Sequence, residues 1–347
     1  MKHTYVFTLS AAVAASLLAC SDDAKSDADF KAEVVAAMHD SIGADLANLV
    51  QAAKDLQAAA PTHQWDNTAD ATAIAAMKDA WKRTRVAYEH VEGATAPIFG
   101  DLDFTMDARY DDQLIPLIPE GDQDLFDDQG VTGMHAIERI LYAPGIRDTV
   151  LDFEEPLPGY KAADYPTNET EALAFKTKLA QKLIDDAQSL LDNWQPNMID
   201  VAFAFQGLVG LMNEQGEKVD LAATGEEESR YADLTMFDLR NNLEGTTKIY
   251  GLFRAWIQSK PALVDADTKV VARLDALKAL YTQTTSDSIP AVPESWSADQ
   301  PTTADLATPF GTLWSSVRAD VDPDTNTSIV FQMHLIADAL GFPELPE

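Results

Sequence analysis

Apolar residues recur at every fourth position along most of this chain, and this spacing limits its fold more than any other feature. The first run, over residues 30–50, places its apolar side chains on one face of a helix. Alternating apolar and polar residues, the pattern of half-buried strands, are scarce. We therefore expect an all-α fold built from helical bundles. The remaining runs cover residues 74–91, 175–194, 201–222, 231–257, 271–280 and 330–340.

Three segments interrupt the helical spacing. Residues 100–130 are rich in aspartate, residues 144–167 hold four prolines, and residues 285–310 are rich in Ser, Thr, Asp and Pro. Each composition predicts a loop. Because 347 residues are too many for one ordinary core, we expect two bundle domains packed together, with the boundary in the middle loop. The predicted domains are an N-terminal bundle, 30–160, and a C-terminal bundle, 161–347.

The N-terminus has the features of a bacterial lipoprotein signal. An early lysine precedes a short apolar stretch that is too short to span a bilayer, and this stretch ends in Leu17-Leu18-Ala19-Cys20. The last four residues resemble a lipobox, so we expect a signal peptide over 1–19, lipid on Cys20 and a polar tether over 20–29. An ordinary secretory signal is the alternative. Ser21 after the cysteine favours the periplasmic face of the outer membrane.

The composition is strongly acidic. Asp and Glu number 57 against 25 Lys and Arg, which gives a formal net charge of −32. Such a surface repels phosphate backbones, so nucleic acid is excluded as an expected partner, whereas cations are attracted. Cys20 is the only cysteine, so packing or a bound metal must hold the fold together without an intrachain disulfide.

The segment Gly130–Tyr142 contains the best candidate for chemistry. His135 and Glu138 are three residues apart, so they share one face of a helix. An imidazole and a carboxylate at this spacing can bind one metal ion, and iron, zinc or manganese would all suit them. The alternatives are a surface ion pair or a hydrogen-bonded core histidine.

A second candidate is a helix stripe of four residues, Trp81, Arg85, Tyr88 and Glu92. Two charges on an otherwise aromatic face are costly unless they are paired or coordinate an ion. Glu92 could supply a further metal-binding carboxylate that Arg85 positions, or the two could form an internal salt bridge. Glu89 lies off the stripe, and we expect it to be solvated.

These residues together resemble the imelysin-like family, which includes iron-regulated protein A and an insulin-cleaving membrane protease. Gly133 to Glu138 match the G-x-H-x-x-E motif of the family, and the stripe at residues 81–92 resembles its W-x-x-x-R-x-x-[YW]-x-x-x-E helix. The similarity extends over nearly the whole mature chain. Its other matching positions are Phe99, Gly100, Asp107, Ser229, Asp238, residues 242–245, Ile249 and Tyr250.

The resemblance implies two helical bundles, an envelope location and a link to iron acquisition. It also implies that His135 and Glu138 are metal ligands, with Glu92, Arg85 and Asp107 near the site. We expect a metal-binding envelope lipoprotein, with iron favoured and zinc as the other choice, that works with iron-uptake components. One alternative is a metallopeptidase, although a His-Glu-x-x-His motif is absent from the sequence. The other is a structural or interaction lipoprotein without a metal.

Overall fold

The computed structural model describes residues 25–343 except 223 and 225. The signal peptide predicted over 1–19 and the lipid site at Cys20 therefore lie outside the described residues. The first helix, α1 (Asp27–Ala59), begins at a capping box in which Ser26 and Asp29 each accept the other's backbone N–H. Because this box starts the helix at Asp27, the tether predicted over 20–29 overlaps the helix by three residues.

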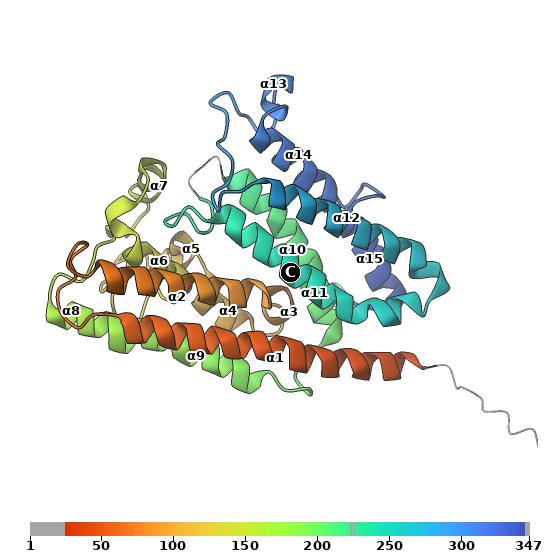
Figure 1. Cartoon of the computed structure of the whole chain (residues 1–347), viewed down its shortest axis with the longest axis horizontal. Coiled ribbons are helices and arrows are strands. Elements are labelled where there is room, and N and C mark those ends of the chain that lie inside the picture. The colour runs from red at the N-terminus through yellow and green to blue at the C-terminus, as the bar shows by residue number, and fades with distance from the viewer. Residues whose placement is uncertain (1–24, 223, 225, 344–347) are drawn as a thin grey trace, which may run out of the picture.

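The first bundle is formed by α1 and the elements that follow it up to residue 193. Its two longest helices, α1 and α2, lie side by side (Figure 1). The apolar face of α1 that the sequence predicts is buried, from Val34 through Met38 to Leu46. The remaining elements of this bundle are α2 (Ala71–Glu89), α3 (Glu92–Thr95), α4 (Gly100–Asp107), α5 (Tyr110–Leu114), η1 (Ile115–Leu117), α6 (Gly133–Leu141), η2 (Ala143–Gly145), α7 (Asp148–Glu154), α8 (Glu169–Ala174), a π-helical turn η3 (Phe175–Leu179) and α9 (Ala180–Asn193).

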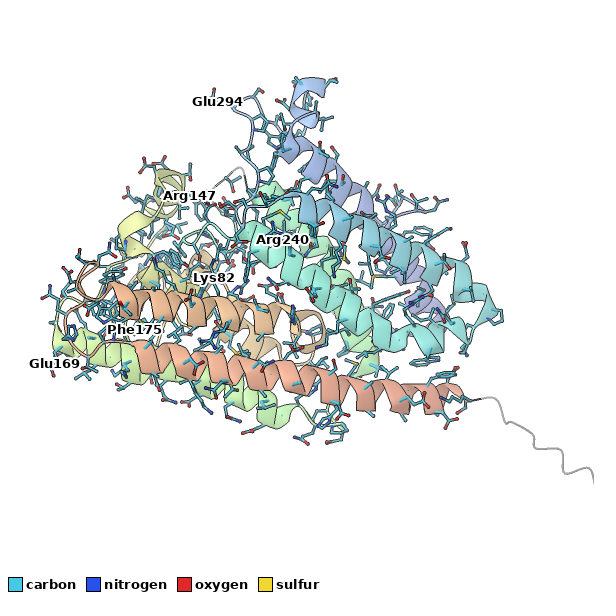
Figure 2. All side chains as sticks on the ribbon, viewed as in Figure 1. Lys82, Arg147, Glu169, Phe175, Arg240 and Glu294 are labelled. Carbon is cyan, nitrogen blue, oxygen red and sulfur yellow. The ribbon has the colours of Figure 1, made fainter. Side chains whose placement is uncertain are left out.

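Helix α9 and the π-helical turn η3, which follow the domain boundary predicted after residue 160, pack on α1 of the first bundle. Gln57 of α1 donates to the carbonyl oxygen of Lys176 at 2.9 Å, and the Trp194 indole N–H donates to that of Met38 at 3.4 Å. Phe175, labelled in Figure 2, is fully buried in this contact. The apolar face of residues 175–194 is buried against α1. We therefore assign the chain up to Asn193 to the first bundle.

The second bundle contains the long helices α10, α11, α12, α14 and α15, which Figure 1 shows above the first bundle. Helices α10 and α11 also contact the first bundle through α1, α2 and α3. The contact between α10 and α3 is close, because a Cβ on Gly207 would lie 1.9 Å from the carbonyl oxygen of Gly93. The elements are α10 (Val201–Leu221), α11 (Thr235–Gln258), η4 (Pro261–Leu263), α12 (Val264–Gln283), α13 (Thr303–Leu306), α14 (Pro309–Val321) and α15 (Ile329–Leu340).

The three predicted loops contain more helix than their composition suggests. Helices α4 and α5 lie in the first loop, α7 lies in the second, and α13 with the start of α14 lies in the third. The aspartates that led to the loop prediction in the first segment, such as Asp101 and Asp111, stand in first helical turns. Negative charge there is favourable because the helix N-terminus is positive.

The two bundles share one continuous hydrophobic core. Asp287, in the segment after α12, pairs with Arg240 of α11 at 3.1 Å and with Lys82 of α2 at 3.5 Å (both cations are labelled in Figure 2). No strand is present within the described ranges 25–222, 224 and 226–343. None of the helices in this part of the chain is both long enough and apolar enough to cross a bilayer.

Candidate metal centre

Gly133 determines where α6 begins. Its φ is +83°, and a Cβ here would lie 2.5 Å from the carbonyl oxygens of the two residues that precede Asp107. A glycine therefore lets the start of α6 contact the end of α4. Gln113 secures the junction by accepting the Thr132 N–H at 2.6 Å and donating to the Thr132 carbonyl at 3.0 Å. This junction brings His135 close to Asp107.

His135 and Glu138 form a buried pair, as their spacing predicts. The His135 Nδ1 lies 2.8 Å from Glu138 Oε2, and both side chains are at most 1% exposed. The other carboxylate oxygen, Oε1, accepts the backbone N–H groups of Tyr231 at 3.1 Å and Ala232 at 2.8 Å. Glu138 was predicted as a metal ligand, but it lies at Nδ1 and so on the other side of the ring from the group that Nε2 forms with Asp107 and Glu228.

The second ring nitrogen of His135 faces two carboxylates from distant segments. Nε2 lies 3.5 Å from Asp107 Oδ1 and 4.0 Å from Glu228 Oε1. One ligand atom from each of the three residues falls within 4.8 Å of the other two. The Nε2 atom is buried and has no hydrogen-bond partner in the described part of the chain. Asp107, predicted as a supporting residue, is thus as close to His135 as a ligand would need to be.

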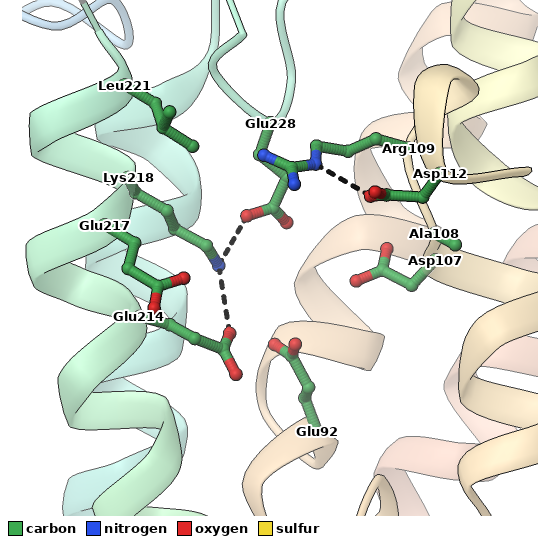
Figure 3. A pocket seen from close by; sticks show the side chains of 10 residues that line it. All are labelled: Glu92, Asp107, Ala108, Arg109, Asp112, Glu214, Glu217, Lys218, Leu221 and Glu228. Atoms are coloured by element: carbon green, nitrogen blue, oxygen red, sulfur yellow. Dashed lines mark hydrogen bonds and ion pairs between the residues drawn. The ribbon is translucent and has the colours of Figure 1, made fainter. Parts of the chain in front are cut away.

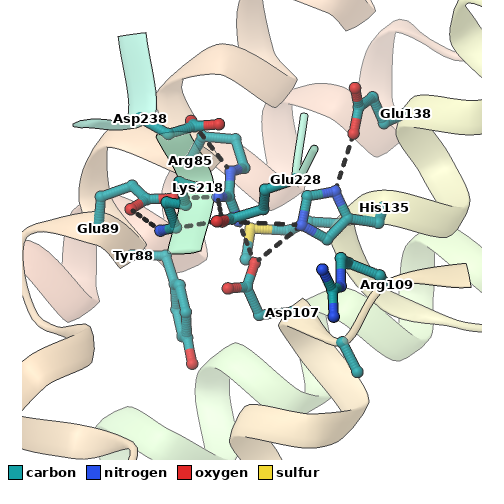
Figure 4. A network of polar contacts seen from close by, with 12 residues as sticks. Arg85, Tyr88, Glu89, Asp107, Arg109, His135, Glu138, Lys218, Glu228 and Asp238 are labelled. Atoms are coloured by element: carbon teal, nitrogen blue, oxygen red, sulfur yellow. Dashed lines mark hydrogen bonds and ion pairs between the residues drawn. The ribbon is translucent and has the colours of Figure 1, made fainter. Parts of the chain in front are cut away.

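Arg85 links the carboxylates of this site into one network (Figure 4). Its guanidinium donates to Asp107, Glu228 and Glu89, and its Nε lies 3.5 Å from Asp238. The Arg85 side chain is fully buried. The predicted supporting role of Arg85 is therefore compatible with its position, because it holds the two carboxylates that face His135.

Two expectations about the stripe on α2 differ from the structure. Glu89, expected in solvent, is fully buried because it pairs with Arg85 one helical turn away. Helix α2 ends at Glu89, so Glu92 starts α3 and does not continue the stripe. Glu92 accepts a hydrogen bond from Asn242 at 2.8 Å and lies outside the group around His135.

Lys218 of α10 is the second cation of the network. Its Nζ donates to Asn242 Oδ1 and lies 2.6 Å from Glu228 Oε2. Glu89 and Glu214 approach the same ammonium at 3.8 and 4.0 Å. Glu228 is thus held from both sides, with one oxygen at Arg85 and the other at Lys218.

The network contains more acidic than basic groups. Six carboxylates surround the two cations Arg85 and Lys218, and most of these side chains are buried. Burial raises the pKa of Asp107 well above its usual value and raises that of Asp238 to about 6. Burial also opposes ionisation of Glu228, but Lys218 and Arg85 outweigh it and hold the pKa low. The six are Glu89, Glu92, Asp107, Glu214, Glu228 and Asp238.

A pocket of about 230 Å³ opens beside this network (Figure 3). Asp107 and Glu228 line its inner end, whereas Glu217 is exposed on the α10 side. Burial and the Arg85 charge lower the pKa of His135 well below its usual value, so the imidazole is neutral at neutral pH. A neutral imidazole and two carboxylates on one side of a cavity form a donor set that suits a transition metal ion.

Sequence reasoning did not identify Glu228, Lys218 or Glu89. Glu228 is the last of three consecutive glutamates, and such a run ordinarily indicates a solvated segment. Lys218 gave no signal in the sequence that separates it from a surface lysine. Glu89, four residues after Arg85, had the i,i+4 spacing of a helical ion pair and could have been found from it.

The fold and this site define a class of all-α protein with an acidic, histidine-containing centre where two bundles meet. The sequence model of the imelysin family, Peptidase_M75, matches residues 42–307. The chain therefore belongs to the imelysin family.

One curated relative is named for iron uptake, and another is named as a lipoprotein of the Efem/EfeO family. The chain is 28% identical over 214 residues to the iron uptake system component EfeM of Pseudomonas syringae pv. syringae, covering 60% of this chain and 59% of that protein. It is 31% identical over 190 residues to an Efem/EfeO family lipoprotein of Staphylococcus haemolyticus, covering 55% and 53%. The matched region thus spans little more than half the length of these relatives.

Solved structures confirm the fold. An imelysin-like protein from Psychrobacter arcticum aligns with a TM-score of 0.61 at 15% identity, covering 92% of this chain and 98% of that one. A protein described as an iron-regulated protein A precursor from Parabacteroides distasonis aligns with a TM-score of 0.58 at 16% identity, covering 92% and 97%. Both similarities support the arrangement of helices and carry no argument about function.

Proposed function

We propose that this protein is an envelope lipoprotein that binds a metal ion, with iron favoured, between His135, Asp107 and Glu228. The observation that carries the proposal is the buried His135 Nε2, which faces two carboxylates and has no hydrogen-bond partner among the described residues. A buried polar atom of this kind ordinarily has a partner, and a metal ion would provide one. The name of the relative EfeM, an iron uptake system component, supports iron as the ion and iron acquisition as the process.

The proposed ligand set changes the roles of the residues predicted from sequence. The proposal requires the tautomer in which His135 Nδ1 carries the proton and donates to Glu138, so that the Nε2 lone pair is directed toward the ion. Arg85 positions Asp107 and Glu228. Glu92 remains a carboxylate of the surrounding network, where it adds negative charge without contacting the ion. Zinc and manganese also suit one imidazole with two carboxylates.

The location rests on the N-terminal segment and on the relatives. Cys20 would carry the lipid anchor after cleavage of residues 1–19, and two of the matched relatives are named lipoproteins. Ser21 favours the periplasmic face of the outer membrane. Iron-uptake components of the same envelope are the proposed partners.

The geometry gives less support to a metallopeptidase. Such an enzyme needs a base near the metal-bound water in addition to its ligands. Glu138 is the carboxylate of the motif, and it is held by two backbone N–H groups and by His135. We therefore propose binding rather than peptide hydrolysis as the use of this site.

The proposal is tested by loading the full chain with Fe²⁺ under anaerobic conditions and measuring bound iron by elemental analysis. The parent should retain one ion per chain, and His135→Ala should lower the affinity by more than about a hundredfold, because loss of a ligand exceeds the effect of losing its supporting partner. His39→Ala is the matched control, since His39 lies on the surface of α1. Circular dichroism should be unchanged in both variants. If His135→Ala retained as much iron per chain as the parent, the proposal would be wrong.

A further inference from the structure

The pocket beside the metal centre has features that indicate which form of metal can enter. It contacts Asp107 and Glu228 directly, so an ion that reaches these two ligands from this side passes through it (Figure 3). From the proposed function we infer that the protein takes a small hydrated cation through this pocket and rejects anionic chelates and haem.

The charges that line the pocket favour a cation. Its carboxylates outnumber its basic groups, which are Arg109 and Lys218 alone among the lining residues. Lys218 already pairs with Glu228 at 2.6 Å, and Arg109 pairs with Asp112 at 3.1 Å. Each of the two cations thus already has a carboxylate partner, which weakens its attraction for the carboxylates of a chelate. The lining carboxylates are Glu92, Asp107, Asp112, Glu214, Glu217 and Glu228.

These carboxylates extend from solvent to the proposed ligands. Glu217 is exposed, Glu214 has a side chain that is 42% exposed, and Glu228 has one that is only 11% exposed. Glu214 and Glu217 both lie on α10, which also carries Lys218. An incoming cation thus meets carboxyl groups of decreasing exposure along the pocket, and those that are ionised raise its local concentration and its association rate.

The size and walls of the pocket argue against a large organic ligand. Its volume of about 230 Å³ is below the roughly 300–1,000 Å³ of cavities that hold drug-sized molecules. Among its lining residues, only Ala108 and Leu221 are apolar. Haem or an aromatic chelator would need a wide apolar wall, whereas an ion with its water shell needs oxygen acceptors.

The access route is tested by stopped-flow association of Fe²⁺, kept anaerobic, with the full chain. Glu214→Gln combined with Glu217→Gln should lower the association rate about tenfold or more at low salt and leave the dissociation rate unchanged. The difference should shrink as salt is added, because the steering is electrostatic. Glu169→Gln combined with Glu294→Gln is the charge-matched control, because both residues (labelled in Figure 2) are exposed and neither lines this pocket, and it should match the parent. An unchanged association rate in the double variant would overturn the route.

The form of the ligand is tested with ferric citrate made from radiolabelled citrate and with haemin. Neither citrate nor haemin should be retained after gel filtration, and ferric citrate should leave the Fe²⁺ association rate unchanged. Retention of one citrate or one haemin per chain would overturn the inference while leaving metal binding at His135 intact. Failure of the parent to bind Fe²⁺ at all would instead overturn the proposed function.

Discussion

Two aspartates with little solvent exposure, Asp267 and Asp107, each pair with an arginine, but they differ in how many other carboxylates share that arginine. Asp267 of α12 accepts two hydrogen bonds from Arg254, both at 2.9 Å, and others from Gln258 at 2.8 Å and Tyr250 at 3.2 Å. One negative charge meets one positive charge there. Burial acts to raise the pKa of Asp267, but these hydrogen bonds outweigh it and the pKa falls.

Asp107 also contacts an arginine, yet its pKa rises well above the usual value. Burial is the largest cause, and Arg85 opposes it but is shared with Glu89, Glu228 and Asp238. The comparison shows that an aspartate in contact with an arginine does not by itself indicate an ion pair whose only role is to stabilise the fold. What matters is whether the charges around that arginine balance, and around Arg85 the acidic groups are in excess, which a bound cation would offset under the proposed function.

Among the substitutions that test this comparison, we expect the largest loss of unfolding free energy from a substitution of Arg85. Arg85→Met would leave four carboxylates without the cation they share, and removal of one partner from a buried ion pair costs about 3–5 kcal/mol. Urea denaturation of the ion-free protein should show this loss. A loss below about 1 kcal/mol would mean that these carboxylates are protonated and do not depend on Arg85.

A substitution in the ion pair of Asp267 and Arg254 should change the stability of the fold without changing iron affinity. Asp267→Asn weakens charged hydrogen bonds to Arg254 and should cost about 1.5–3 kcal/mol of unfolding free energy, measured in urea. Iron affinity should equal that of the parent, because α12 does not contribute to the metal centre. A change of iron affinity in Asp267→Asn would show that overall stability, and not the charge of the site, controls binding.

The substitution Glu138→Gln tests whether Glu138 orients the His135 imidazole or binds the ion directly. Loss of a carboxylate that orients a metal-binding histidine costs about 10–100-fold in affinity. Equilibrium dialysis with Fe²⁺ should give a value in this range, with one ion still bound per chain. Complete loss of the ion, as in His135→Ala, would return Glu138 to the ligand role that the sequence predicts.

The smallest expected effect is that of pH on iron affinity. Metal binding requires ionised carboxylates, and Asp107 has a raised pKa while that of Asp238 is about 6. Affinity should therefore rise with pH, by at most about tenfold per unit for each proton released, and level off above these pKa values. Neutral His135 adds no dependence in this range, because its pKa is lowered. Calorimetry in buffers of different ionisation enthalpy should detect the released protons, and an affinity that falls with rising pH would contradict the account.

The sequence predicts much of the fold because helical spacing directly reports which faces are buried. The motif and the family resemblance also name His135, Arg85 and Asp107 as candidates, and the structure brings these three residues together. The ligand roles predicted for Glu138 and Glu92 stay predictions. In the structure Glu138 accepts the backbone N–H of Tyr231 and Glu92 accepts from the amide of Asn242, contacts that spacing alone could not foresee. Glu228 could not be found by spacing, because it reaches the site through the meeting of two bundles that are distant in sequence.

We propose that the ion lies between His135, Asp107 and Glu228. Anomalous X-ray scattering from crystals of the iron-loaded full chain would locate it. The account predicts one strong peak within bonding distance of His135 Nε2, Asp107 and Glu228, with Glu138 on the far side of the imidazole ring. A peak bound to Glu138 or Glu92, or a peak elsewhere with His135 Nε2 unliganded, would contradict it.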